Sequence, residues 1–346
     1  MKLGIVGNGM IVKGALSSLS CTDIEVRALW CRNEEKGKPL QEEYGFEKLY
    51  SDYDAFLADE SFDTVYIGLP NGLHYEYAKK ALEAGKHAIV EKPFTGCYAE
   101  ASELFGIAEE KGLFLFEAIM SRYSKNYEEI VKHLDEIGDL KLIRCNYSQY
   151  SSRYDAYLEG KVLPAFDPEA AGGALYDINV YNVHFVTGLF GKPKFSYYMA
   201  NTGFNGIDTS GILLMDYGMF KAVCIGAKDS ASESGIVLQG TKGRIEIPNR
   251  PGIVKDVTVV KDDGNTVIDV QVMDDPMRIE FERINDVIDH GNTSQCRLWM
   301  NSTLNAMYVL EEARADIGLV FPCDEVEEEE ALSLDMASML KMMNHK

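Results

Sequence analysis

The chain has 346 residues, of which 46% are hydrophobic, so it is long enough to bury a core in each of two domains. Its formal net charge of −21 repels phosphate backbones and anionic membranes, which argues against nucleic acid or a lipid surface as partner. Seven scattered cysteines without Cys-x-x-Cys, and no His-Glu-x-x-His pattern, give no support for a metal site, and no apolar run approaches the ~20 residues of a membrane-spanning helix. We therefore expect a soluble cytoplasmic protein without a metal.

The first predicted strand, residues 2–6, runs directly into a glycine turn that opens a helix extending to about residue 19. Glycines at 7 and 9 permit a tight turn and let the backbone approach a pyrophosphate, whose charge a helix N-terminus stabilises. Val12 stands where the third glycine of the dinucleotide fingerprint would be. A plain strand-to-helix turn is the alternative to the predicted dinucleotide site, which comprises Gly7, Asn8, Gly9, Met10 and Ile11.

The second strand, residues 24–30, ends in Cys31-Arg32-Asn33, and the first acid after it is Glu34. An NAD-preferring site usually offers an acid here to the ribose hydroxyls. Arg32 could instead pair with a 2′-phosphate through its planar fork of donors. We therefore predict NADP as the preferred cofactor and NAD as the alternative. In the alternative interpretation of this residue, Arg32 only stacks on adenine or faces water.

Helices at about 34–44 and 53–57 and a strand at 64–68 continue the alternation, and Leu69-Pro70-Asn71 then opens a helix that runs to about residue 84. Pro70 and Asn71 have ordinary roles in a turn and a helix cap, although they also lie at a strand end. His74 lies in the first turn, where the helix dipole disfavours its protonation, so a neutral imidazole could contact ribose or nicotinamide. A structural histidine with satisfied ring nitrogens is the alternative.

Residues 87–90 form a short apolar strand that ends in Glu91-Lys92-Pro93. In open α/β sheets the ligand crevice lies outside the carboxyl ends of the strands, so Glu91 and Lys92 are placed beside whatever is bound. Pro93 restricts the backbone of Lys92 and so stiffens the segment that directs its ammonium group. A solvated Glu-Lys pair at a strand end is the simpler alternative.

These motifs together resemble the glucose-fructose oxidoreductase, inositol dehydrogenase and rhizopine-catabolism (Gfo/Idh/MocA) family. The motifs, in order, are Gly7-Asn8-Gly9, Pro70-Asn71-x-x-His74, Ala84-Gly85-Lys86-His87 and Glu91-Lys92-Pro93. A helix at about 98–111 and a strand at 113–116 complete the predicted nucleotide domain, residues 1–120. The next segment, Glu117 to Tyr123, is similar to the family's domain junction, and the resemblance implies that Arg122 touches cofactor or substrate. Alternatively, Arg122 pairs with an acid and fixes the hinge.

After a helix at 127–136, a strand at 140–150 and an irregular stretch at 151–167, a glycine pair at 172 and 173 leads into a helix that ends near residue 188. Helical spacing places Asp177, Tyr181 and His184 on one face. The family signature matches Gly172, Gly173, Leu175, Asp177 and Tyr181, whereas Asn179 replaces its usual glycine. The resemblance implies that Tyr181 is the acid/base, that Lys92 is its cationic neighbour, and that Asp177 positions lysine and substrate. We retain His184 as a substrate contact and a competing acid/base.

The pattern then changes to strands separated by glycine turns, which indicates a large, mostly antiparallel, open-faced sheet in an α+β domain over residues 121–346. The predicted strands are 195–200, 209–217, 219–225, 234–239, 244–247 and 257–260. Runs at 212–215 and 223–225 lack polar alternation, so we expect helices on one face and a second subunit on the other, in a homodimer or higher homo-oligomer. Core helices at 277–289 and 301–317 follow. The acidic run 325–330 and the methionine-rich tail receive no functional role.

The sequence thus predicts an amino-terminal Rossmann domain followed by a substrate-binding and oligomerisation domain. The resemblance implies an NAD(P)-dependent oxidoreductase that acts on the hydroxyl or carbonyl of a sugar, polyol or related small cyclic substrate. In such a reaction an ammonium group near a phenol favours the phenolate and should bring the pKa of Tyr181 toward neutrality. A non-catalytic NAD(P)- or sugar-binding regulatory protein of the same fold is the alternative.

Overall fold

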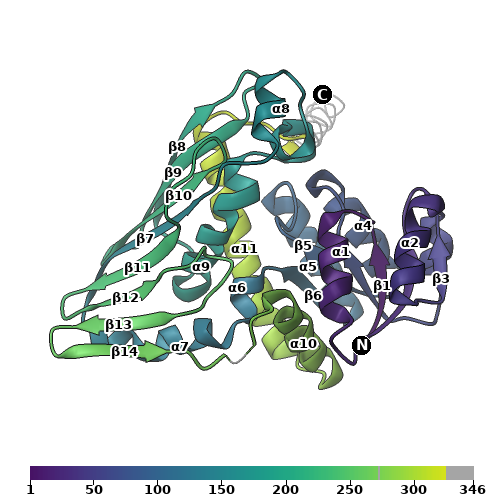
Figure 1. Cartoon of the computed structure of the whole chain (residues 1–346), viewed down its shortest axis with the longest axis horizontal. Coiled ribbons are helices and arrows are strands. Elements are labelled where there is room, and N and C mark those ends of the chain that lie inside the picture. Colours follow the sequence, from purple (N-terminus) through teal and green to yellow (C-terminus); the bar gives the residue numbers. More distant parts are fainter. Residues whose placement is uncertain (272, 325–346) are drawn as a thin grey trace, which may run out of the picture.

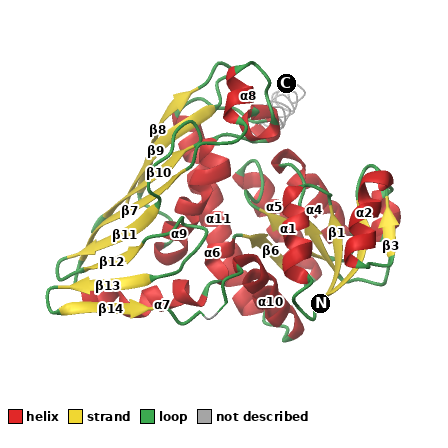
Figure 2. Cartoon of the chain, in the orientation of Figure 1, coloured by secondary structure: helices red, strands yellow, loops and turns green. Residues whose placement is uncertain are grey.

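The computed structural model describes residues 1–271 and 273–324, and it consists of two sheet-based halves joined along one side (Figures 1 and 2). A six-stranded sheet forms the amino-terminal half, and an eight-stranded sheet forms the other. The acidic run and methionine-rich tail discussed above lie outside the described residues.

The amino-terminal half is a Rossmann domain with a parallel sheet in the order β3-β2-β1-β4-β5-β6. Its strands are β1 (Lys2–Val6), β2 (Glu25–Trp30), β3 (Lys48–Tyr50), β4 (Thr64–Ile67), β5 (His87–Glu91) and β6 (Leu115–Ala118). Its helices are α1 (Met10–Leu19), α2 (Glu34–Tyr44), α3 (Tyr53–Leu57), the short turn η1 (Asn71–Leu73), α4 (His74–Glu83) and α5 (Tyr98–Lys111). The predicted alternation is confirmed; the three-residue strand β3 was not predicted.

Alternate residues of the central strand enter two different cores. Leu3 and Ile5 pack on the α1 side of the sheet, whereas Val6 packs on the α4 and α5 side. This explains why the strands read as continuous apolar runs, since both faces of a parallel sheet are covered. Gly68 supplies the space that the missing third glycine would have given, because a Cβ on it would lie 2.7 Å from Cγ2 of Val12.

The second half contains an eight-stranded sheet in the order β14-β13-β12-β11-β7-β10-β9-β8, antiparallel except for the pair β7 and β10. The strands are β7 (Leu140–Ser148), β8 (Phe195–Thr202), β9 (Asp208–Asp216), β10 (Lys221–Ala227), β11 (Gly235–Gly240), β12 (Arg244–Ile247), β13 (Val257–Lys261) and β14 (Gly264–Ile268). The mostly antiparallel fold class is confirmed. The sequence analysis missed β14, whose polar and glycine residues leave most of it exposed.

The helices of the second half, except for the one at Pro276–Asp289, cover one face of this sheet and leave the other face bare. They are α6 (Met120–Tyr123), α7 (Lys125–His133), η2 (Leu134–Ile137), α8 (Tyr154–Leu158), η3 (Pro164–Phe166), η4 (Pro168–Ala170), the π-helical turn η5 (Leu175–Asn179), α9 (Val180–Phe190), α10 (Pro276–Asp289) and α11 (Thr293–Asp316). The long α11 runs between the two halves (Figure 1) and starts eight residues before its predicted start at 301. In the described part of the chain, no helix has the length and apolarity needed to cross a membrane.

Helix α10 packs back onto the Rossmann domain, although it lies far along the chain (Figure 1). Its Phe281 and Ile284 join Val12 and Leu16 of α1 in one core. The amino group of Met1 also lies 2.8 Å from Oδ1 of Asp289, at the end of α10. The two halves are therefore joined by a second connection besides the one that follows β6.

Candidate active site

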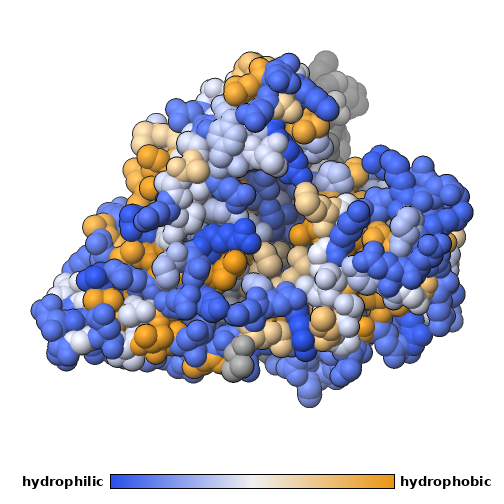
Figure 3. All heavy atoms as spheres, viewed as in Figure 1, coloured by the Kyte–Doolittle hydropathy of each residue, from blue (hydrophilic) through white to orange (hydrophobic). Residues whose placement is uncertain are grey.

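A cleft of about 640 Å³ lies at the carboxyl ends of the Rossmann strands, where the space-filling view shows a hollow between the two halves (Figure 3). Arg153 and Asp177 reach it from the second half. The rest of its wall comes from the first half: Gly7, Asn8, Gly9, Met10, Ile11, Trp30, Cys31, Arg32, Asn33, Lys36, Gly68, Leu69, Pro70, Asn71, Glu91 and Lys92. All of the predicted cofactor residues except His74 therefore line one cleft.

The glycine turn gives this cleft the features that a pyrophosphate requires. Gly7 has φ of +112°, a conformation that favours glycine, and a Cβ there would lie 2.6 Å from the carbonyl oxygen of Gly68. Gly9 has no atom within 4 Å of its Cβ position, and it precedes α1 without a side-chain cap or an acid in the first turn. The free N–H groups of this helix end therefore fit an anionic group, as in a dinucleotide.

The end of β2 is basic on its cleft side. Arg32 and Lys36 both line the cleft, whereas the carboxylate of Glu34 accepts a hydrogen bond from Ser51 at 2.8 Å and is not part of the lining. Asn33 caps α2 by accepting from the backbone N–H of Glu35 at 3.0 Å. Two cations and no acid thus face the position that a 2′-phosphate would occupy.

His74 is fully buried and joins two strand-end turns. Its Nδ1 lies 2.8 Å from the carbonyl oxygen of Pro93, and its Nε2 lies 2.9 Å from that of Leu69. Burial lowers the pKa of His74, against the opposing effect of the two carbonyls. The structure therefore places His74 behind the cleft wall, where it fixes the turns that carry Asn71 and Lys92. This arrangement is the structural alternative named in the sequence analysis.

Lys92 and Asp177 line the cleft and come together with Tyr181, which is not itself part of the lining. Nζ of Lys92 donates to Oδ1 of Asp177 at 3.0 Å and to its carbonyl oxygen at 2.8 Å. The same ammonium lies 5.2 Å from the centre of the Tyr181 ring. The structure thus brings together the three residues to which the sequence analysis assigned the chemistry.

Neighbouring charged groups determine the protonation states of the residues in this cluster. Burial by itself would lower the pKa of Lys92, but the carboxylate of Asp177 holds it above its ordinary value. Burial would likewise raise the pKa of Asp177, but Lys92 and Lys228 hold it well below its usual range. Glu91 differs, because burial raises its pKa to about 7 despite a hydrogen bond from Tyr66 at 2.6 Å. Lys92 is therefore a permanent cation, and Glu91 titrates near neutrality.

Tyr181 is partly buried at the junction of the two cores. Its ring lies 5.8 Å from that of Tyr147, and a Cβ on Gly252 would lie 3.2 Å from it. Burial raises the pKa of Tyr181, and this effect exceeds the lowering by Lys92. Our expectation of a pKa near neutrality is therefore corrected: the phenol stays protonated, because desolvation outweighs the nearby cation.

His184 does not join the cluster. The π-helical turn η5 contains Asp177 and changes its spacing to α9, whereas Tyr181 and His184 both lie in α9 with regular helical spacing. His184 is buried, and its Nε2 lies 3.1 Å from Oε2 of Glu117. This buried pair is absent from the cleft lining, so the structure gives no support for His184 as a substrate contact.

Arg122 also lies outside the cleft lining. Its guanidinium donates to the carbonyl oxygen of Gly188 at 2.9 Å and packs on the ring of Tyr127. These contacts tie α6 to α9 at the domain junction. Arg122 thus fixes the hinge, though through a backbone carbonyl and an aromatic ring rather than through the acid that we had considered.

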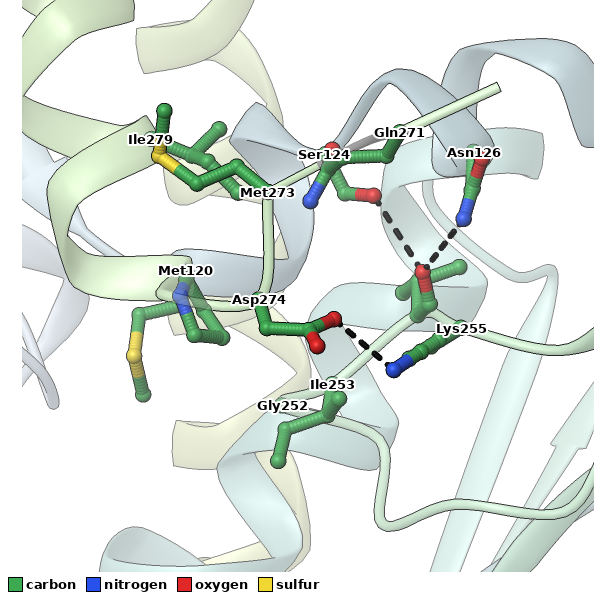
Figure 4. Close-up of a pocket in the computed structure, with 12 residues that line it drawn as sticks. Met120, Ser124, Asn126, Gly252, Ile253, Lys255, Gln271, Met273, Asp274 and Ile279 are labelled. Atoms are coloured by element: carbon green, nitrogen blue, oxygen red, sulfur yellow. Dashed lines mark hydrogen bonds and ion pairs between the residues drawn. The ribbon is translucent and has the colours of Figure 1, made fainter. Parts of the chain in front are cut away.

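A second cavity, of about 20 Å³, shows how the loop that carries Gly252 is fixed (Figure 4). Ser124 and Asn126 point toward each other across it and both donate to the carbonyl oxygen of Val254, at 3.4 and 3.0 Å. Lys255 pairs with Asp274 at 2.7 Å on the opposite side. These contacts hold the loop against Tyr181.

The fold also brings together a group that sequence spacing did not reveal. The ligand atoms of Cys97, Glu100 and Cys323 lie within 4.8 Å of one another. Glu100 already has a structural role at the start of α5, where its Oε2 accepts from the backbone N–H of Gly96 at 3.0 Å. The sequence-based expectation of no metal site rested on the spacing of residues along the chain. Metal binding at Cys97, Glu100 and Cys323 would be the test of that expectation.

Comparison with known proteins identifies the family and the fold. Residues 1–119 match a model of an oxidoreductase family with an NAD-binding Rossmann fold, and residues 130–246 match the GFO/IDH/MocA C-terminal domain. The chain belongs to the GFO/IDH/MocA oxidoreductase family. The resemblance seen in the sequence is confirmed.

Two characterised relatives of this family member match it over nearly their full length. It is 32% identical over 331 residues to scyllo-inositol 2-dehydrogenase (NADP(+)) IolU of Bacillus subtilis, covering 94% of this chain and 99% of that one. It is 29% identical over 333 residues to D-xylose 1-dehydrogenase (NADP(+)) 2 of Haloferax volcanii, covering 92% and 100%. The structure of KijD10, a 3-ketoreductase from Actinomadura kijaniata in complex with NADP and TDP-benzene, has a TM-score of 0.80 at 23% identity, covering 91% and 97%, and it shares the fold.

The sequence analysis missed three charged residues at the site of this GFO/IDH/MocA protein. Lys36 and Arg153 line the cleft, and Lys228 pairs with Asp177. Lys36 lies in the first turn of α2, close along the chain to Arg32 at the preceding strand end, and this proximity could have indicated it. Arg153 is in an irregular segment, so no period located it. Lys228 follows an apolar strand, where a lone lysine was a signal that we did not use.

Proposed function

We propose that this protein is an NADP-dependent oxidoreductase that transfers a hydride between the coenzyme and a hydroxyl or carbonyl carbon of a sugar, polyol or related small cyclic compound. The observation that carries the proposal is the cluster of Lys92, Asp177 and Tyr181 beside a dinucleotide-shaped cleft. The relatives that act on inositol and xylose support the substrate class. The basic pair Arg32 and Lys36 supports NADP over NAD.

The chain's own contribution is to orient the substrate and to move a proton. A bound nicotinamide coenzyme supplies or accepts the hydride. The phenol of Tyr181 donates its proton to the oxygen of a carbonyl substrate as that oxygen gains negative charge, and Lys92 stabilises the resulting phenolate. In the opposite direction, the phenolate accepts the proton of the alcohol. The raised pKa of Tyr181 keeps the phenol of the free protein in the protonated form from which a carbonyl substrate can accept a proton.

The proposal is tested by titrating cofactor-free protein with NADPH and NADH, followed by nicotinamide fluorescence. The tighter complex is then mixed with a panel of sugars, polyols and dicarbonyls, and loss of NADPH absorbance is recorded. We expect tighter binding of NADPH and turnover of at least one member. Tight binding without any turnover would instead favour a ligand-sensing protein of the same fold, and an absence of binding would contradict both readings.

A further inference from the structure

A second buried lysine holds the carboxylate that pairs with Lys92. Lys228 directly follows β10, and its side chain is only 3% exposed. Its Nζ lies 2.8 Å from Oδ2 of Asp177, donates to the carbonyl oxygen of Ala165, and lies 4.3 Å from the centre of the Phe166 ring. Asp177 therefore has one oxygen on each of two lysines, since its Oδ1 accepts from Lys92.

This arrangement decides the charge that Tyr181 experiences. An isolated Lys92–Asp177 pair is neutral, so its field falls off quickly with distance. With Lys228 the three paired groups are two ammonium groups and one carboxylate, so these three groups together carry one more positive than negative charge. Glu91 and Tyr147 also face Tyr181, and Asp208 and Lys92 face Lys228. Burial lowers the pKa of Lys228, and Asp177 opposes this effect. Glu91 and Asp208 are acids, so neither can supply the positive charge that Lys228 contributes.

We propose that Lys228 is a positioning residue, which divides the Asp177 carboxylate between two lysines and thereby directs an uncompensated Lys92 cation at Tyr181. The inference rests on the proposed function, because it assigns Lys228 a role in the same proton transfer. Nothing in the family motif that matches this chain includes the residue. Its effect on the reaction is carried through Asp177 and is not made by contact with the reacting atoms.

A purely structural role is the competing explanation. Through the carbonyl of Ala165, Lys228 also anchors the irregular segment between α8 and η5, and this contact alone could account for a buried lysine. The two explanations differ in one respect. The structural role needs a donor at this position, whereas the positioning role needs a positive charge coupled to Asp177.

The test is a mutant cycle in the full-length protein, with Lys228→Met, Lys228→Gln, Lys228→Arg, Asp177→Asn and Asp177→Asn/Lys228→Met. We measure kcat and KM on the substrate found in the panel, together with the Kd for NADPH. Lys228→Met and Lys228→Gln should each lower kcat about tenfold to a hundredfold while the Kd changes less than about twofold, and Lys228→Arg should recover most of kcat. The double variant should be no slower than Asp177→Asn alone.

Lys86→Met is the matched control. Lys86 is another buried lysine that donates to two carbonyl oxygens, of Asp59 and Phe62, and lies 4.6 Å from the Phe62 ring centre, but it has no place in the cleft. Its substitution should lower the free energy of unfolding and leave kcat unchanged. If Lys228→Met does not fold, Lys228→Gln still decides the question, because it keeps an N–H donor for Ala165 and loses only the charge.

Three outcomes would contradict the proposal separately from the proposed function. The first is an unchanged kcat in Lys228→Gln, and the second is a failure of Lys228→Arg to restore kcat. The third is a kcat of the double variant that falls by the product of the two single-variant decreases instead of matching Asp177→Asn alone. A wild-type protein that turns over no panel member would instead overturn the proposed function, and with it the role assigned to Lys228.

Discussion

Tyr181 carries the proton in the proposed reaction, and Lys92 supports it from the face of the ring. Tyr181→Phe removes only the hydroxyl, so it should lower kcat by about 10²–10⁴ and leave the Kd for NADPH nearly unchanged. Lys92→Ala should lower kcat and also weaken NADPH binding, because Lys92 lines the cleft. Stopped-flow turnover and fluorescence titration measure the two quantities. Retained turnover in either variant would remove that residue from the mechanism.

Arg32 should determine the choice between NADPH and NADH. Its substitution by Gln removes a cation opposite the predicted 2′-phosphate, so the Kd for NADPH should rise about 10–100-fold while that for NADH changes little. Lys38→Gln is the control, because Lys38 lies nearby on α2 but pairs with Glu35 outside the cleft. An unchanged ratio of the two dissociation constants in Arg32→Gln would contradict this assignment.

Glu91 should make the stability depend on pH. Its pKa is raised from 4.5 to about 7 by burial, so between these values the folded protein keeps a proton that the unfolded chain has lost. Stability should therefore fall as pH rises through this window, by about 3 kcal/mol from this residue. The free energy of unfolding, measured in urea at pH 5 and pH 7, should decrease less between these pH values in Glu91→Gln than in the wild type. Parallel pH profiles for the two proteins would contradict the prediction.

At the scale of elements, the loop between β12 and β13 forms a wall against Tyr181. A Cβ at Gly252 would lie 3.2 Å from Cε1 of Tyr181, so Gly252→Ala should displace the ring by a few tenths of an ångström and lower kcat more than it weakens NADPH binding. Gly106→Ala is the control, since nothing lies within 4 Å of the Cβ position at Gly106. Equal kcat in the two variants would show that the loop does not position the phenol.

The periodicity of apolar residues predicted the regular strands and helices better than it predicted the π-helical turn η5 at the site. The strands of the Rossmann half follow the apolar runs because they are buried on both faces of the sheet, and the glycines mark the ends of the elements between them. The π-helical turn has no comparable signal, since it depends on tertiary fit. Asn179 within it accepts from Asn182 and lies against Gly226, whose missing side chain leaves it room. The prediction assumed one regular helix from Asp177 through α9, and this turn changes the spacing between them.

Motif order likewise located most of the site, whereas residues recruited by tertiary contact escaped it. Gly7, Arg32 and Lys92 follow strands, and strand ends are where a parallel sheet collects its ligand contacts. Lys228 follows a strand of the antiparallel sheet and reaches Asp177 only because η5, which lies well before it in the chain, packs against β10 within the second half. The burial that raises the pKa of Tyr181 is also a property of the packed molecule, so no reading of the local sequence could have given it.

For the whole molecule, the bare face of the eight-stranded sheet predicts self-association. Apolar side chains gather along this edge of the molecule, over β8 and β9 (Figure 3), and Ile212 and Leu214 are 40% and 43% exposed opposite Met199 and Tyr197. Light scattering should give a multiple of the 38.6 kDa chain mass, and Leu214→Lys should reduce it. Leu298→Lys, an exposed leucine on α11, should not. A monomeric wild type would contradict the prediction.

The return of α10 to the Rossmann half has an evolutionary consequence. A gene segment that encodes only residues 1–120 would not specify a complete folding unit, because Phe281 and Ile284 close the core beneath α1. Transfer of this half to another protein would have to bring a covering helix with it or evolve a substitute. Recombination should therefore preserve the two halves as one heritable block, and new substrate specificities should arise by changes in the loops rather than by exchange of halves.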